Sequence, residues 1–347
     1  MKTELNRFFS ALALFALASL GCQPATAFAQ GVLTPPGAPA PTMKTLDQIE
    51  ARTPISSLPY TITNPGSYYL TTNVTGVSGT AGITVSSGNV TIDLNGFALF
   101  GVAGSYSGVA VQGTYTNITV RNGTVSGWPI NGVDAWSFGY PRNLDFEKLT
   151  VSANGNIGIY TEAGSTVRDS FSIGNGGAGI ISSGGLIADC VVRDNSGDGI
   201  DAIECTVRHC EVQNSGNYGM YVSSCVVSDC LIMRSAADGI DVYGPGCQII
   251  GNTLQGDTVS QTSGHASINV LAGNNRIEGN HVTTSGSIHW GISVPSNSGN
   301  VVVKNTVSGA GSNSYFIAGN NAYGTIITLT GALTVISSSN PWANFAY

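Results

Sequence analysis

A repeat of about 20 residues between Leu186 and Cys247 constrains the fold of this chain more than any other feature. Its clearest mark is a tetrapeptide that reads Asp-Gly-Ile-Asp at 198–201, Tyr-Gly-Met-Tyr at 218–221 and Asp-Gly-Ile-Asp again at 238–241. A unit this short cannot bury its apolar face alone. The repeat therefore predicts a solenoid, in which each unit packs only against its neighbours.

Short β-branched runs that end in Asn, Asp or Gly extend the pattern along the chain. One motif reads Ile-Thr-Val-Arg-Asn at 118–122 and Val-Arg-Asp at 167–169, and a second begins with Gly, as in Gly158-Ile159. Two such strand motifs per turn, at periods of about 20 to 26 residues, predict an all-β parallel solenoid of about ten rungs. Asn and Asp tolerate the left-handed backbone of a sharp bend, which favours a structural turn ladder over a ligand-binding one.

The charge of the chain limits its partners. Only 10% of the 347 residues are charged, the net charge is −7 and the pI is near 4.9. No basic run is present, and phosphate contacts need clustered cations, so the sequence argues against nucleic acid as a partner. An anionic polysaccharide would need a cation or a local arginine to compensate the negative charge.

The N-terminus reads as a targeting segment. Residues 1–29 have a basic start, an apolar run and an Ala-Phe-Ala site at 27–29, which predicts a signal peptide. Lipid attachment at Cys22 is the competing interpretation, and Ser19 at a position that usually holds Leu disfavours it. The mature chain is thus expected to be extracellular, periplasmic or on the cell surface, and no later stretch predicts a transmembrane helix.

Caps are expected at both ends of the solenoid. Residues 30–44 are rich in Pro, Gly and Ala and predict a linker. Thr45 and Gln48 form a capping-box pattern, which predicts a short helix at 46–52 that ends before Pro54 and shields the first rung. The β-helix with its N-terminal cap is expected over 45–322 and a C-terminal cap over 323–347, in which Trp342 caps the last rung rather than binding a ligand.

The bend motifs and the Gly-Ile motifs, from about Ser67 to Ala310, resemble the right-handed parallel β-helix proteins of the pectate-lyase-like superfamily. The segments at 46–50, 65–70 and 93–97 also resemble a group of secreted bacterial β-helix proteins of unsettled function. The resemblance implies a single right-handed parallel β-helix and, if the chain is an enzyme, a polysaccharide lyase or glycoside hydrolase. The Asn-Thr-Asp, Asp-Asp, Gly-His-Gly and Arg-Tyr-Lys motifs of the polygalacturonases do not occur, so no catalytic residue is transferred.

Six cysteines follow the repeat. They form two columns, which are Cys190, Cys210 and Cys230, and Cys205, Cys225 and Cys247. Stacked at about 4.8 Å, neighbouring members lie within the Cα range of a disulfide. Three members cannot all pair within one column, so buried free thiols that fill a narrow core are the favoured interpretation.

The candidate site lies on the outer face of the repeat. If Ile200, Met220 and Ile240 point inward, alternation turns their neighbours Asp201, Tyr221 and Asp241 outward. Asp201 and Asp241 are the candidate catalytic residues, because two rungs separate them by about 9.6 Å, at the upper edge of the spacing of about 6.5–9.5 Å in inverting glycosidases. The candidate substrate-binding residues are Asp198, Tyr218, Tyr221, Asp238 and Trp290, with histidines 265 and 289 toward one end.

The four aspartates at 198, 201, 238 and 241 are also the candidate ligands for Ca²⁺. Competing interpretations are a preference for Asp at the turn before Gly, for Asp198 and Asp238, and a solvated face, for Asp201 and Asp241. Two functions remain: an exported protein that binds or processes a polysaccharide or cell-surface glycan, and a non-catalytic surface or adhesive protein. The sequence leaves the glycan and the oligomeric state open.

Overall fold

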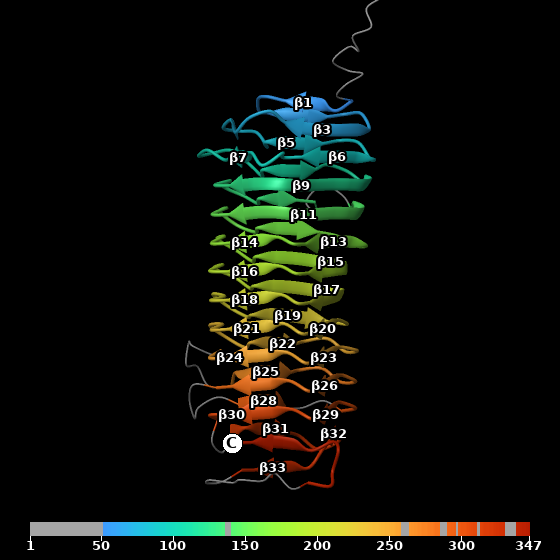
Figure 1. Ribbon diagram of the computed structural model, residues 1–347, viewed down its shortest axis with the longest axis vertical. Coiled ribbons are helices and arrows are strands. Elements are labelled where there is room, and N and C mark those ends of the chain that lie inside the picture. Colours follow the sequence, from blue (N-terminus) through green and yellow to red (C-terminus); the bar gives the residue numbers. More distant parts are fainter. Residues whose placement is uncertain are drawn as a thin grey trace, which may run out of the picture. The chain divides into compact units, whose positions relative to one another are not determined.

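The computed structural model describes residues 51–135, 140–257, 264–284, 290–295, 298–310, 313–329 and 338–347. These residues form a right-handed parallel solenoid of about 11 turns (Figure 1). Every strand pairing in the described ranges is parallel, and none of these residues is α-helical, which confirms the all-β prediction. The predicted signal peptide and linker lie outside the described residues, as does nearly all of the predicted helix at 46–52.

Each turn contributes to three parallel ladders rather than the two that the sequence predicted. Ladder 1 consists of β2 (Tyr60–Ile62), β5 (Ile83–Val85), β8 (Val109–Val111), β10 (Val133–Asp134), β12 (Ile159–Thr161), β15 (Ile180–Ala188), β17 (Ile200–Arg208), β19 (Met220–Ser223), β22 (Ile240–Val242), β25 (Ala266–Val270), β28 (Trp290–Val294) and β31 (Tyr315–Ile317). Ladder 2 consists of β1 (Thr53–Ile55), β3 (Gly66–Leu70), β6 (Val90–Asp93), the first halves of β9 (Thr116–Ser126) and β11 (Arg142–Ser152), β13 (Ser165–Arg168), the second halves of β15 and β17, β20 (Val226–Ser228), β23 (Gln248–Ile250), β26 (Arg276–Glu278), β29 (Val301–Val303) and β32 (Ala322–Tyr323).

Ladder 3 was not predicted. It consists of β4 (Val74–Thr75), β7 (Ala98–Phe100), the second halves of β9 and β11, β14 (Phe171–Ile173), β16 (Val191–Arg193), β18 (Glu211–Gln213), β21 (Leu231–Met233), β24 (Thr253–Gln255), β27 (His281–Thr283), β30 (Thr306–Ser308) and β34 (Asn344–Ala346), which also pairs with β33 (Ile326–Thr328). Most of these strands are three residues long with one buried central side chain, as in β18. A run this short shows no alternation that could distinguish it from a turn.

The first turn begins earlier than predicted. Pro54, expected to end a helix, lies instead in β1, the first described strand of ladder 2, which pairs with β3. A proline is tolerated there because an edge strand does not need every backbone N–H. Toward the C-terminus β34 pairs with both β30 and β33, while Trp342 remains half-exposed beneath the ammonium group of Lys304, and the C-terminal cap over 323–347 stays a prediction.

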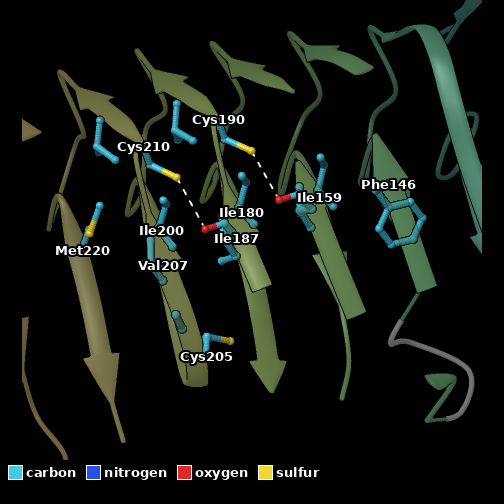
Figure 2. Packing of buried hydrophobic residues seen from close by; sticks show 14 of the residues in the cluster. Phe146, Ile159, Ile180, Ile187, Cys190, Ile200, Cys205, Val207, Cys210 and Met220 are labelled. Atoms are coloured by element: carbon cyan, nitrogen blue, oxygen red, sulfur yellow. Dashed lines mark hydrogen bonds between the residues drawn. The ribbon is translucent and has the colours of Figure 1, made fainter. Parts of the chain in front are cut away.

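Aliphatic side chains from all three ladders fill the interior. Figure 2 shows Ile159, Ile180, Ile200 and Met220 stacked on successive turns beside Cys190 and Cys210. All six cysteines of the repeat are buried and free, which confirms the favoured interpretation of the two columns. Burial raises the pKa of Cys247, so this thiol stays protonated at neutral pH.

The cysteine columns continue as asparagine columns toward the C-terminus. The backbone N–H of Cys230 donates to the side-chain oxygen of Asn252 at 3.0 Å, just as Asn252 N donates to Asn280. The second column behaves in the same way, since Cys247 N donates to Asn275 at 2.7 Å. The bends before the first column hold positive φ angles, for example 54° at Asp229. The structure therefore supports the structural interpretation of the turn ladder over the ligand-binding one.

None of the described residues belongs to a helix of the length and hydropathy that crossing a bilayer requires.

Candidate functional site

Ladder 1 brings the main candidate residues onto one face. Ile200, Met220 and Ile240 are fully buried in the core. Their neighbours Asp201, Tyr221 and Asp241 pair in register across β17, β19 and β22, and the same register continues through Asn269 and Ser293. The predicted alignment of these side chains is confirmed, and it follows from the fixed period of two within each strand.

The degree of burial on this face was not predicted. Asp238 and Asp241 are each only 1% exposed, so the interpretation of Asp241 as part of a solvated face is wrong. Asp198 and Asp201 remain half-buried. Two carboxyl groups held away from water need partners, because desolvation penalises the charged form.

Asp198 and Asp238 have related structural roles at the bend before β17 and β22. Asp198 accepts a hydrogen bond from the backbone N–H of Tyr218 at 3.1 Å, and Asp238 accepts one from Ala266 N at 2.7 Å, each on the next turn. This agrees with the turn preference considered for both residues. Asp238 makes further contacts, since Asn269 Nδ2 donates to its Oδ2 and His265 Nδ1 lies 3.1 Å from its Oδ1.

The electrostatics separate Asp201 from Asp241. Burial, with a smaller effect of Asp198, raises the pKa of Asp201 to about 6. Burial and the adjacent Asp238 raise the pKa of Asp241 to about 8. Near neutral pH Asp241 is therefore mostly protonated and Asp201 mostly ionised. Carboxyl groups whose environments push their pKa values apart are typical of an acid and a base that act together.

Three stacked tyrosines lie beside these carboxyl groups. The Tyr218 and Tyr221 rings are 5.2 Å apart at 12°, and the Tyr221 and Tyr243 rings are 3.9 Å apart at 14°. Burial raises the pKa of Tyr218 most, and the negative charges of Asp241 and Asp238 raise it further. The Tyr218 ring therefore lies near these two carboxyl groups. Sequence reasoning missed Tyr243, because it lies beyond the repeated tetrapeptide, at a position where the two preceding rungs have Ser223 and Ile203 instead of an aromatic residue.

Trp290 stands apart from the tyrosine stack. It lies three turns beyond Tyr218, pairs in register with Ala266, and packs on Phe316 with ring centroids 5.1 Å apart. His265 joins the carboxylate group through Asp238. Histidine 289 lies outside the described residues, so its predicted place near Trp290 stays a prediction.

The face also extends toward the N-terminus, where sequence reasoning named no residue. The register that holds Asp201 runs back through Ile181 and Tyr160 to Asp134 and Ala110. Burial raises the pKa of Tyr160, with contributions from Glu162, Asp134 and Asp201. A signal was available, because Gly-Val-Asp at 132–134 and Gly-Ile-Tyr at 158–160 repeat the pattern of Gly-Ile-Asp at 199–201.

The four aspartates do not come together as a metal site. Among the described ranges, no group of three or more His, Cys, Asp or Glu side chains is arranged to hold a metal ion. Asp198 and Asp238 already direct oxygens at backbone N–H groups. Binding of Ca²⁺ by Asp198, Asp201, Asp238 and Asp241 therefore gains no support from this arrangement and stays a prediction.

The raised pKa of Asp241 predicts how stability depends on pH. In the folded state this group keeps a proton that the unfolded chain, with a carboxyl pKa of 3.8, releases at lower pH. Its contribution to stability is therefore fully present below pH 3.8 and is lost as the pH rises through about 8. We expect the Tm of the wild type to fall relative to that of Asp241→Asn by on the order of 5 °C between about pH 5 and 8.

Thermal melts of both proteins at several pH values, followed by circular dichroism, would measure this fall in the Tm of the wild type relative to that of Asp241→Asn. Asp201 titrates in both proteins and provides the common background. Parallel curves for the wild type and Asp241→Asn would show that Asp241 does not hold an extra proton in the folded state.

No protein-family model and no curated protein sequence matches this chain. Solved structures do match. The A-module of the Azotobacter vinelandii mannuronan C-5 epimerase AlgE6 aligns at 15% identity and a TM-score of 0.62, covering 85% of this chain and 88% of that one. The Dettilon tailspike protein aligns at 15% identity and a TM-score of 0.57, covering 78% of this chain and 62% of that one.

A third match is the catalytic domain of a GH87 α-1,3-glucanase in complex with nigerose, at 13% identity and a TM-score of 0.52, covering 84% of this chain and 71% of that one. Identities this low carry information about the fold alone. Together with the three parallel ladders, they establish that the chain is a right-handed parallel β-helix protein.

Proposed function

We propose that this chain binds and hydrolyses a neutral polysaccharide on the outer face of ladder 1. The observation that carries the proposal is the pair Asp201 and Asp241, two turns apart on one face with pKa values of about 6 and about 8 and a tyrosine stack beside them. The epimerase module and the α-1,3-glucanase that share the fold are, by their names, proteins that act on polysaccharides. Export, which the N-terminus predicts, would bring the protein to such polymers.

The two carboxyl groups fit the roles that glycoside hydrolysis needs. Asp241, protonated near neutral pH, would donate its proton to the glycosidic oxygen as the bond to the anomeric carbon breaks. Asp201, ionised, would take a proton from the water that attacks that carbon from the other side. Their separation of two turns, about 9.6 Å, leaves room for this water and favours inversion over retention. Protons and charge balance, because Asp241 ends ionised and Asp201 ends protonated.

The charge of the face selects the class of glycan. The register from Asp134 to Phe316 includes Asp201 and Asp241 and places no lysine or arginine. A polyuronate would meet like charge there, whereas sugar hydroxyls can donate to carboxylates and a pyranose face can stack on an outer ring of the tyrosine stack. A neutral, hydroxyl-rich polymer is therefore the expected ligand.

Replacing Tyr221 by alanine tests the binding step. Tyr221 is the central ring of the stack, so its loss leaves the outer rings Tyr218 and Tyr243, on which a sugar would stack, without their support. We expect the Kd for a neutral polysaccharide to rise by about 10-fold, in keeping with loss of a stacking contact of about 1.4 kcal/mol. Affinity electrophoresis against a panel of neutral and acidic polysaccharides would measure it.

The control for this test is Tyr347→Ala, which removes an exposed tyrosine at the far end of the chain. If every neutral polymer retarded Tyr221→Ala and Tyr347→Ala equally in the gel, the tyrosine stack would not be part of the binding site. Preferential binding to polyuronates would contradict the choice of a neutral glycan.

One observation favours the second candidate, a non-catalytic surface protein. Asp241 is 1% exposed, so a substrate can reach its proton only if the surrounding side chains move. Such a protein would bind glycan without cleaving it. Polysaccharide retained on the protein with no new reducing ends over a prolonged incubation would support this candidate and contradict the hydrolytic step.

A further inference from the structure

A cavity of about 290 Å³ opens on ladder 1, toward the N-terminus from the tyrosine stack. Its lining includes Ala110 and Asp134, which belong to the same register as Asp201. Three turns separate Asp134 from Asp201, about 14 Å along the axis. The cavity is therefore distinct from the site described above, although it lies on the same face.

The walls of the cavity differ in chemistry. Tyr106 and Ile130, which are 51% and 40% exposed, offer a flat ring and an aliphatic surface, and the methyl group of Ala110 adds to the apolar side. Gln112 supplies an amide at the exposed rim. The carboxyl group of Asp134 is 2% exposed, and Ser107 Oγ donates to its Oδ2 at 3.3 Å, which fixes its orientation.

The cavity is preformed because its floor is rigid. The fully buried Trp128 packs on Gly82 and Gly108, the chain neighbours of the lining residues Ala81 and Ser107, and donates from Nε1 to the carbonyl oxygen of Leu99 at 3.2 Å. Its indole packs so closely on Gly82 and Gly108 that a Cβ at either position would lie within 2.9 Å of the ring. A rigid pocket loses little entropy on binding a ligand.

We propose that this cavity binds a single uncharged pyranose with an apolar edge, of which a 6-deoxyhexose is the best fit. A volume of about 290 Å³ is at the small end of ligand pockets, which favours one ring over a longer chain. The sugar face stacks on Tyr106, the methyl group at C5 contacts Ile130 and Ala110, and ring hydroxyls bond the amide of Gln112 at the rim. A uronic acid is excluded, because its carboxylate takes the place of the methyl group at C5 and would lose its water against Ile130 and Ala110.

Titration with methyl glycosides tests this proposal on the full chain. The probes are methyl 6-deoxy-α-mannopyranoside, methyl α-mannopyranoside, which restores the hydroxyl at C6, and methyl α-glucuronopyranoside. Saturation-transfer NMR and calorimetry should show the deoxy sugar binding at least 5-fold more tightly than its hydroxylated partner, and no binding of the uronide. Equal binding of all three, or no binding of the deoxy sugar at millimolar concentration, would overturn the proposal.

Two variants locate the site. Tyr106→Ala should weaken binding of the deoxy sugar at least 10-fold, and Tyr323→Ala, which removes a tyrosine of similar exposure at 54%, should not. Tyr106 is exposed, so this change leaves the core intact. Unchanged binding of the deoxy sugar by Tyr106→Ala would show that the sugar does not bind in this cavity. Tyr221→Ala should retain full monosaccharide binding, which keeps this result separate from the fate of the polysaccharide site on the tyrosine stack.

Discussion

Asp201→Asn is expected to lower the rate of polysaccharide hydrolysis by about 10²–10⁴-fold with little change in affinity. The asparagine keeps the size of the side chain but cannot take a proton from water. The wild-type rate should rise with pH through about 6, where Asp201 loses its proton, and fall above about 8, where Asp241 loses its proton. Release of reducing ends from the neutral polymers that bind the protein measures both effects.

The matched control is Asp229→Asn. Asp229 is an exposed aspartate with a φ of 54°, a left-handed conformation that asparagine adopts equally well. This variant should hydrolyse at the wild-type rate. If Asp201→Asn did the same, Asp201 would not be the base.

Asp241→Asn separates the acid from the base. Without a proton donor, hydrolysis of ordinary glycosidic bonds should fall to a similar degree, while aryl glycosides with an acidic leaving group should lose far less, because such groups depart without protonation. NMR of the first product should show an inverted anomeric centre. A retained configuration would contradict the roles given to two carboxyl groups that lie two turns apart.

Asn280→Ala is expected to destabilise the solenoid by about 3–5 kcal/mol. The Asn280 side chain accepts from the backbone N–H of Asn252 and donates to Ile249 O at 2.8 Å and to Asn305 Oδ1 at 2.9 Å. It is 1% exposed, so water cannot replace these bonds. Truncation would leave donors and acceptors of two neighbouring turns unsatisfied in a dry interior.

Two comparisons make the Asn280 result specific. Asn64→Ala, at an exposed position, should change stability by no more than about 0.5 kcal/mol. Asn280→Cys should cost less than Asn280→Ala, because the sulfur of Cys230 already accepts a backbone N–H at the equivalent place on another turn. Urea unfolding followed by circular dichroism would measure all three, and a loss for Asn280→Ala as small as that for Asn64→Ala would show that the asparagine column contributes little.

The sequence by itself determined the parallel β-helix, the inward columns and the register of Asp201, Tyr221 and Asp241. It could do so because the repeat is nearly constant from Leu186 to Cys247 and a strand turns alternate side chains to opposite faces. It also favoured free thiols for the six cysteines, which are buried and unpaired in the structure. Ladder 3 escaped prediction because one buried residue per strand carries no period.

Only the tertiary structure decided how the candidate site is built. The burial of Asp238 and Asp241, the place of Tyr243 in the stack and the cavity at Asp134 depend on side chains and turns that do not repeat. A pKa depends on what covers a group and on which charges lie beside it, and both are set by contacts across turns. Periodicity therefore fixes which residues share a face, whereas packing between non-equivalent residues decides which of them are protonated, covered or open to a ligand.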